Sequence, residues 1–273
     1  MSEAMLAHVA RLYYRRELTK QEIARRLGLS RFKVARLLEQ ARATGVVRIE
    51  LDEPIPVDDA LCRALEERYG LELALVVPEH ALPAAAAGLL PGLIGEGETL
   101  GVGWGETLSA VADALPRLAR GIRVVQICGA VPGLEPGTGP TEVALRFAER
   151  LGGPAHTLPA PALASRAARD ELLAHETIRP TVERFAEVST ALVGIGARPE
   201  GGHVLVHVFD RDGRLVETDL SDRAIALSLL PRRARVVAVA GGEAKRDAVR
   251  GALAASLVDA LVTDPGCAEA ALA

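Results

Sequence analysis

Lys245 is the single residue best placed for binding chemistry. It lies in the first turn of a helix predicted over 243–253, directly after Gly241 and Gly242. A cation there is repelled by the positive end of the helix dipole, and a bound anion such as a phosphate would offset that repulsion. A solvated lysine, or one paired with a neighbouring acid, is the alternative interpretation.

A second group of cations opens the helix predicted to follow Ser30. Because the apolar positions of this helix face inward, Arg31, Lys33 and Arg36 remain on its outer side. Helices that present such positions read the major groove of DNA, where arginine prefers the O6 and N7 atoms of guanine. A basic, solvated face on a small helical bundle is the other interpretation. The predicted DNA-binding residues are Thr19, Gln21, Ser30, Arg31, Phe32, Lys33 and Arg36.

Three helices and a short strand are predicted to position these cations. Thr19 and Glu22 have the spacing of a capping box at the start of the second helix. Gly28 ends that helix, and Ser30 caps the third. Residues 46–51 then alternate like a strand. This order predicts a winged helix-turn-helix. Whether Phe32 packs against the first helix or contacts a thymine methyl or sugar stays open.

The charge distribution divides the 273-residue chain into two parts. Residues 1–48 carry eleven Lys and Arg against four Asp and Glu, a net charge of +7, while the whole chain has −4, which leaves −11 for 49–273. The segment 52–58 contains two prolines and three acids and is predicted to be a linker. We therefore predict a small DNA-binding domain over 1–53 and a larger, acidic domain over 54–273.

Composition excludes several classes of protein. Three cysteines lie far apart, so neither a disulfide framework nor a zinc site is indicated. Aromatic residues make up only 3% of the chain, too few for base-stacking platforms. The N-terminus lacks the core of a signal peptide, and the longest apolar stretch, 81–94, is too short to span a bilayer. We expect a cytoplasmic protein without a metal or cofactor.

Beyond the linker, apolar strands alternate with amphipathic helices. Strands are predicted over 73–77, 99–103, 122–128, 155–158, 189–195, 203–209, 235–240 and 257–262. Helices are predicted over 58–69, 84–94, 106–118, 141–151, 167–186, 243–253 and 265–272. This alternation predicts an α/β fold with an open, mostly parallel, Rossmann-like sheet covered on both faces.

Glycine turns follow three of these strands. They contain Gly103 and Gly105, Gly129, and Gly241 with Gly242. Glycine lets backbone N–H groups approach an oxyanion, and ligands of open α/β sheets bind at the carboxyl ends of the strands. For any one turn, glycine used only for its geometry is the alternative.

Other side chains near these turns each allow two interpretations. Trp104 stacks on a sugar face or plugs the pocket floor, and Thr107 donates to a phosphate or bonds its own backbone. Gln126 and Cys128 share one face of a strand, whose direction is open. Asp264 precedes a proline, which favours a helix cap.

The run 12-LYYRRELTKQEIARRLGLSRFKVARLLEQARATGVVRIEL-51 resembles the N-terminus of the SorC family of sugar-responsive bacterial transcriptional regulators. Further similar blocks lie at 101–115, 124–129, 141–153, 207–216, 236–253 and 261–264. The resemblance implies a winged helix-turn-helix over 1–53 and, over 54–273, a sugar-binding effector and oligomerisation domain of the ribose-phosphate-isomerase and glucosamine-phosphate-deaminase type. It also implies a homodimer or homotetramer that binds operator DNA and responds to a sugar or sugar phosphate, with a ligand-contacting lysine at position 245.

Two positions depart from the pattern of that family. Glu106 stands where these regulators often carry arginine or another non-acidic residue, and it would repel a phosphate. His203 aligns with an acidic sugar-binding residue and changes how hydroxyls are recognised, unless it is an edge-strand residue without a role. His207 shares the predicted face of His203, but two histidines without a third ligand make a poor metal site.

We therefore predict a regulator of a carbohydrate-metabolism operon, gated by a sugar or sugar phosphate and without catalytic residues. Its predicted effector-binding residues are Gly103, Trp104, Gly105, Thr107, Gln126, Gly129, His203, Gly241, Gly242 and Lys245. The alternative is a sugar-phosphate isomerase or deaminase with an N-terminal interaction module, which would need a general base. Its candidate acids, none in a recognised catalytic motif, are Glu106, Glu135, Asp210 and Asp264. A structural DNA binder is a third class, which leaves the α/β part unexplained.

Overall fold

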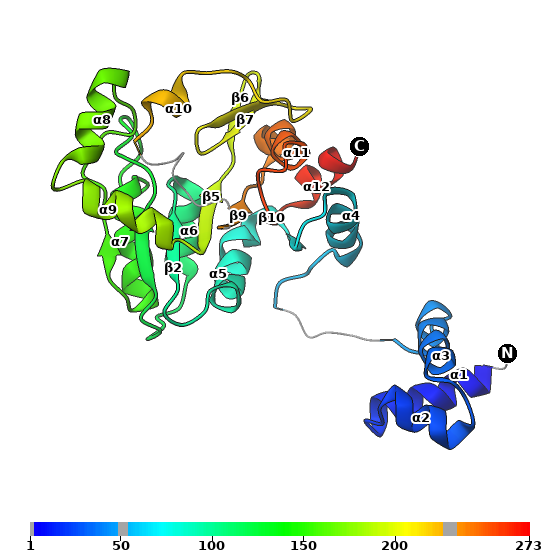
Figure 1. Ribbon diagram of the computed structural model, residues 1–273. Helices are drawn as coiled ribbons and strands as arrows, with labels where there is room; N and C mark the ends of the chain where they lie inside the picture. Colours follow the sequence, from blue (N-terminus) through cyan, green and yellow to red (C-terminus); the bar gives the residue numbers. More distant parts are fainter. Residues whose placement is uncertain (1–2, 49–53, 226–233) are drawn as a thin grey trace. The chain divides into compact units, whose positions relative to one another are not determined.

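The computed structural model of the protein describes residues 3–48, 54–225 and 234–273 (Figure 1). The chain divides into two compact units, Met1–Pro54 and Ile55–Ala273. No helix among the described residues is long and apolar enough to cross a membrane.

The smaller unit contains three helices, α1 (Glu3–Ala10), α2 (Lys20–Leu27) and α3 (Arg31–Ala43), and a π-helical turn over Arg11–Arg15 extends the first. Their apolar faces meet in one core, in which Val9, Ile23 and Val34 are fully buried. The predicted wing strand is not present over 46–48, and its remaining part, 49–51, lies outside the described residues.

The helix ends of this unit follow the local sequence. The N–H of Glu22 donates to the Thr19 hydroxyl at 3.3 Å, and the N–H of Thr19 donates to the Glu22 carboxylate at 2.8 Å. This confirms the capping box. Gly28 ends α2 in the left-handed conformation, and the Ser30 hydroxyl caps α3 by accepting from the N–H of Lys33. Short-range sequence thus positions the start of α3.

The larger unit is built on a seven-stranded sheet in the order β1-β10-β9-β5-β2-β3-β4. Every pairing in it is parallel, which confirms the predicted mostly parallel α/β sheet. The strands are β1 (Leu73–Val76), β2 (Thr99–Val102), β3 (Arg123–Gln126), β4 (Ala155–His156), β5 (Thr190–Gly194), β9 (Arg235–Val239) and β10 (Ala260–Thr263).

Helices cover both faces of this sheet. One face packs on α5 (Leu82–Leu93), α6 (Glu106–Ala114) and α7 (Pro140–Leu151), and the other on α4 (Asp59–Tyr69), α11 (Arg246–Ala254) and α12 (Pro265–Leu272). Successive strand residues alternate between the two cores, as Val124 and Val125 do. The end of the predicted linker belongs to this unit, because Asp58 caps α4 and its N–H donates to the Val76 carbonyl.

Two predicted elements of the larger unit are wrong. The strand predicted over 203–209 is a hairpin of β7 (Gly201–Val204) and β8 (His207–Asp210), which forms a separate antiparallel sheet with β6 (Gly196–Arg198). The turn contains Leu205 with a positive φ of 55°. Leucine rarely adopts this conformation, so the sequence did not indicate a turn here.

The helix predicted over 167–186 is divided into α8 (Arg166–Ala174), α9 (Arg179–Glu183) and a 3₁₀ turn over Arg184–Glu187. Pro180 explains the break, because it has no N–H to continue the helix from the preceding turn. A four-residue helix, α10 (Leu220–Arg223), follows later in the chain.

The strand order creates a crevice at the centre of the sheet. After β2 the chain continues to β3 on one side, whereas after β5 it continues to β9 on the other. Strands β2 and β5 are neighbours, so the connections that leave their carboxyl ends diverge. Open α/β sheets bind ligands at such a topological switch point.

Candidate functional site

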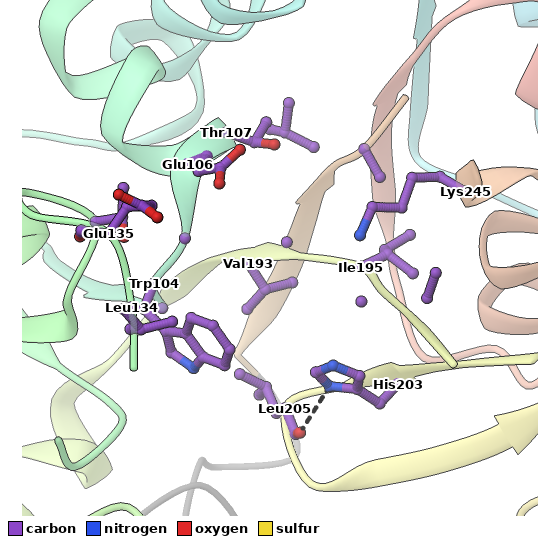
Figure 2. A pocket seen from close by; sticks show the side chains of 18 of the residues that line it. Trp104, Glu106, Thr107, Leu134, Glu135, Val193, Ile195, His203, Leu205 and Lys245 are labelled. Atoms are coloured by element: carbon purple, nitrogen blue, oxygen red, sulfur yellow. Dashed lines mark hydrogen bonds between the residues drawn. The ribbon is translucent and has the colours of Figure 1, made fainter. Parts of the chain in front are cut away.

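A cavity of about 560 Å³ lies at the carboxyl ends of β2, β5 and β9 (Figure 2). Six of the ten predicted effector-binding residues line it: Gly103, Trp104, Gly105, Thr107, His203 and Lys245. The single tryptophan of the chain is therefore a pocket residue, and its fluorescence can report binding. Figure 2 shows Glu106, Glu135 and Trp104 on one side of the cavity, with Lys245 and His203 opposite.

The other four predicted residues do not line this cavity. Gln126 is fully buried: its side-chain amide donates to the Cys128 carbonyl at 2.6 Å and accepts from the N–H of Leu158 at 3.0 Å. Gly129 packs against the carbonyl of Pro161. Gly241 packs against the Asp264 carboxylate and Gly242 against that of Glu79, and the N–H of Gly242 donates to Asp264 at 2.7 Å. Both glycines therefore support the backbone of this turn.

The glycine N–H groups expected to face an oxyanion already have partners inside the protein. The N–H of Gly103 donates to the Leu192 carbonyl at 2.9 Å, and that of Gly105 donates to the Thr138 carbonyl at 3.0 Å. Gly105 still needs to be glycine, because its φ of 117° is a conformation that other residues rarely adopt. These turns thus fix the shape of the cavity wall.

Lys245 ends a 3₁₀ turn over Glu243–Lys245 and points into the cavity (Figure 2). The predicted alternative, pairing with Glu243 or Asp247, is not found: no ion pair joins Lys245 to any residue that the structure describes, and Glu243 pairs with Arg246 at 3.8 Å. Burial lowers the pKa of Lys245, and the Glu106 carboxylate opposes that shift.

His203 lines the same cavity, and its Nδ1 lies 3.4 Å from the Leu205 carbonyl oxygen (Figure 2). Burial lowers the pKa of His203, and the charges of Arg198 and Lys245 act in the same direction. Both effects favour the neutral form of the imidazole. His207 does not lie on the same face of the hairpin as His203. The hairpin pairs His203 with Val208, so these two side chains share a face, and His207, as the neighbour of Val208 in the strand, points to the opposite face.

Gly196 leaves the space that the His203 ring occupies, since a Cβ atom there would lie 1.9 Å from Nε2. We expect Gly196→Ala to displace the ring and lower effector affinity about tenfold, or about 1.4 kcal/mol. The midpoint of thermal unfolding should change little, because the clash involves only the end of a side chain. Titration of each protein with the effector, followed by Trp104 fluorescence, measures the two dissociation constants. Gly88→Ala on the exposed side of α5, where a Cβ meets nothing within 4 Å, is the control, and equal affinities would contradict this role of His203.

Only two of the four acids considered for an enzyme, Glu106 and Glu135, line the cavity. Asp210 accepts the N–H groups of Asp212 and Arg214, both at 2.9 Å, and holds the turn after β8. Asp264 caps α12, as predicted, by accepting from the N–H of Cys267. Burial alone would raise its pKa, but hydrogen bonds from Gly242 and Cys267 outweigh burial and lower it.

Sequence reasoning missed how the wall that carries Leu134 and Glu135 is held. Arg146 of α7 donates to the Ser109 hydroxyl at 2.6 Å and to the Gly137 carbonyl at 3.2 Å. The glycine- and proline-rich stretch 131–139 after a strand was the signal for this loop. The segment 193–197, which also lines the cavity, had a similar signal in its Gly-Ile-Gly turn.

The predicted DNA-binding residues gather at the starts of α2 and α3. Arg31, Lys33 and Arg36 are exposed, and no ion pair joins them to an acid in the described part of the smaller unit. Phe32 is 86% exposed, so the interpretation that it packs against the first helix is wrong. The hydroxyls of Thr19 and Ser30 serve as caps, and Gln21 is exposed.

Comparison with known proteins identifies the family to which the chain belongs. Residues 55–205 and 201–273 match the family model described as "Putative sugar-binding domain". The crystal structure of the full-length sorbitol operon regulator SorC from Klebsiella pneumoniae superposes with a TM-score of 0.73 at 25% identity, with 99% of each chain covered. The chain belongs to the SorC family.

Curated proteins with similar sequences are regulators. The erythritol catabolism regulatory protein EryD of Brucella abortus is 31% identical, over 98% of this chain and 96% of its own. The deoxyribonucleoside regulator of Bacillus subtilis is 29% identical, over 96% of this chain and 95% of its own. This SorC-family chain is accordingly a transcriptional regulator with a sugar-binding domain and not an enzyme.

Proposed function

We propose that this SorC-family regulator controls a carbohydrate-metabolism operon in the cytoplasm by binding operator DNA as a homodimer or homotetramer. Residues 1–53 form a winged helix-turn-helix that reads the DNA. Residues 54–273 form an oligomerisation and effector domain of the ribose-phosphate-isomerase and glucosamine-phosphate-deaminase type. A sugar or sugar phosphate binds in the cavity at the centre of the sheet and alters DNA affinity.

The observation that carries this proposal is the lining of the cavity. An ammonium group, an imidazole, a hydroxyl and an indole converge at the switch point of the sheet, on Lys245, His203, Thr107 and Trp104. Polar donors that converge beside an aromatic surface suit a polyhydroxylated ligand, whose hydroxyls need partners and whose C–H face packs on a ring. The separate smaller unit, in which Arg31, Lys33 and Arg36 have no ion pair with any described residue, supplies the DNA-binding surface.

We infer a route of communication from the elements that hold Lys245. Its turn leads directly into α11, which packs against α12, and α12 packs against α4. The Tyr69 hydroxyl of α4 donates to the Ala271 carbonyl at 2.5 Å. Helix α4 is the first helix after the smaller unit, so a shift of Lys245 toward a ligand can reach it. The effector must bind one arrangement of the oligomer better than another, since equal binding shifts no equilibrium.

We expect Lys245→Ala to lower effector affinity at least tenfold, roughly 1.4 kcal/mol for the loss of a charge-assisted contact. Calorimetry or Trp104 fluorescence measures the dissociation constant. Lys20→Ala in the smaller unit is the matched control and should leave this constant unchanged. Equal affinity of the Lys245 variant and the unmodified protein would remove Lys245 from the binding set.

The function as a whole is tested by fluorescence anisotropy on tiled DNA from upstream of the protein's own operon, with and without sugars and sugar phosphates. We expect salt-sensitive binding to particular tiles that one compound alters. Specific binding that no compound alters would contradict the gating, and the absence of specific binding would contradict the regulatory function itself.

A further inference from the structure

The charges around the cavity are not those of a phosphate site. Among the lining residues that the structure describes, the charged side chains are Glu106, Glu135 and Lys245, which together carry a net charge of −1 at pH 7. Burial and the neighbouring cations lower the pKa of His203, which favours its neutral form. The nearby Arg198 does not line the cavity and lies 3.6 Å from the Glu200 carboxylate. A phosphate dianion entering this cavity would meet more negative than positive charge.

Two backbone N–H groups beside the cavity are not free to bind an anion. The N–H of Gly105 at the start of α6 is taken by the Thr138 carbonyl, and the N–H of Gly242 is taken by the Asp264 carboxylate. The positive end of the α6 dipole faces the cavity but carries its own carboxylate, Glu106, in the first turn. The favourable potential that would attract a phosphate at this helix is already balanced by that side chain.

The same groups suit a ligand without charge. Figure 2 shows the two carboxylates on one side of the cavity and the Lys245 ammonium on the other, with Val193 and Ile195 between them. Carboxylates accept hydrogen bonds from hydroxyl groups, and an ammonium group donates to their oxygens. A chain or ring of hydroxyls that bridges the two sides satisfies both at once, whereas a phosphate dianion has no proton to donate and its charge is repelled by the two carboxylates.

We propose, on the basis of the regulatory function proposed above, that the effector of this cavity is an uncharged polyhydroxy compound, a free sugar or polyol. Glu106 and Glu135 exclude the corresponding phosphate ester by repulsion and accept hydrogen bonds from its unphosphorylated parent. Lys245 then acts as a hydrogen-bond donor whose charge Glu106 partly balances, and not as the anchor of a phosphate.

The test compares matched pairs that differ only in the phosphate: erythritol and erythritol 4-phosphate, sorbitol and sorbitol 6-phosphate, deoxyribose and deoxyribose 5-phosphate. Calorimetry on the full chain measures each dissociation constant, and anisotropy on operator DNA measures each response. We expect one parent compound to bind at least tenfold more tightly than its own phosphate. A phosphate that binds more tightly than its parent and alters DNA binding would overturn this inference and leave the regulatory function intact.

The double variant Glu106→Gln, Glu135→Gln tests the stated cause. It should raise the affinity for the phosphate and reduce the preference for the parent at least tenfold. Glu67→Gln with Glu96→Gln, two exposed acids outside the cavity, is the control with the same change in charge and should leave the preference unchanged. An unaltered preference in the cavity variant would overturn the role of the carboxylates. If no compound of either kind binds, the inference and the proposed gating both fail, while specific DNA binding would still stand.

Discussion

Replacing Arg31, Lys33 and Arg36 together by alanine is expected to weaken operator binding at least about a hundredfold near 0.1 M salt. All three side chains are exposed at or near the start of α3 and lack an acidic partner in the described part of their unit. Each base contact of an arginine or lysine contributes about 1–3 kcal/mol to discrimination, and each phosphate contact releases counterions. Stability should change little, because none of the three side chains is buried.

Salt dependence separates the two kinds of contact. The slope of log affinity against log salt should flatten by roughly 0.9 for each phosphate contact that the triple variant removes. Anisotropy titrations at several salt concentrations measure this slope. The control replaces three exposed arginines of the larger unit, Arg117, Arg179 and Arg214, by alanine, which changes the net charge equally. An equal loss in the control would mean that overall charge, and not the surface of α3, determines DNA affinity.

The features that were predictable from sequence are those determined within a few residues. The capping box of Thr19, the Ser30 cap and the Asp264 cap each join positions three residues apart, and all three were found. The parallel sheet was also predictable, because buried parallel strands are continuously apolar and alternate with amphipathic helices.

The features that were not predictable depend on partners distant in sequence. Nothing around Gly105 indicates that its N–H meets the Thr138 carbonyl, so a turn that looked like an anion site is a support for the cavity wall. Likewise, alternation across 203–209 does not reveal the tight turn at Leu205 that reverses the chain and separates His203 from His207. The local sequence pattern placed the pocket at the correct strand ends. It did not determine which polar groups in the pocket remain free to bind a ligand.

Gln126 shows the same limit. Its position in a strand near a glycine turn suggested an effector contact, yet its side chain is fully buried and joins β3 to the chain around Leu158. The amide accepts from the N–H of Leu158 at 3.0 Å and from the Thr141 hydroxyl at 3.1 Å, and it donates to the Cys128 carbonyl. A leucine of similar size would leave these groups buried without partners, and each such group costs about 1–3 kcal/mol.

We therefore expect Gln126→Leu to lower the free energy of unfolding of the larger unit by about 2–5 kcal/mol. Its midpoint of thermal unfolding should fall by roughly 5–15 °C, as followed by near-UV circular dichroism. Gln40→Leu on the exposed side of α3 is the control and should leave that transition unchanged. At a temperature where the variant is folded, effector affinity should stay within about twofold, because Gln126 does not line the cavity. Unchanged stability with a large loss of affinity would mean instead that Gln126 turns toward the ligand, and the hydrogen bonds to Leu158 would then belong only to the unliganded arrangement.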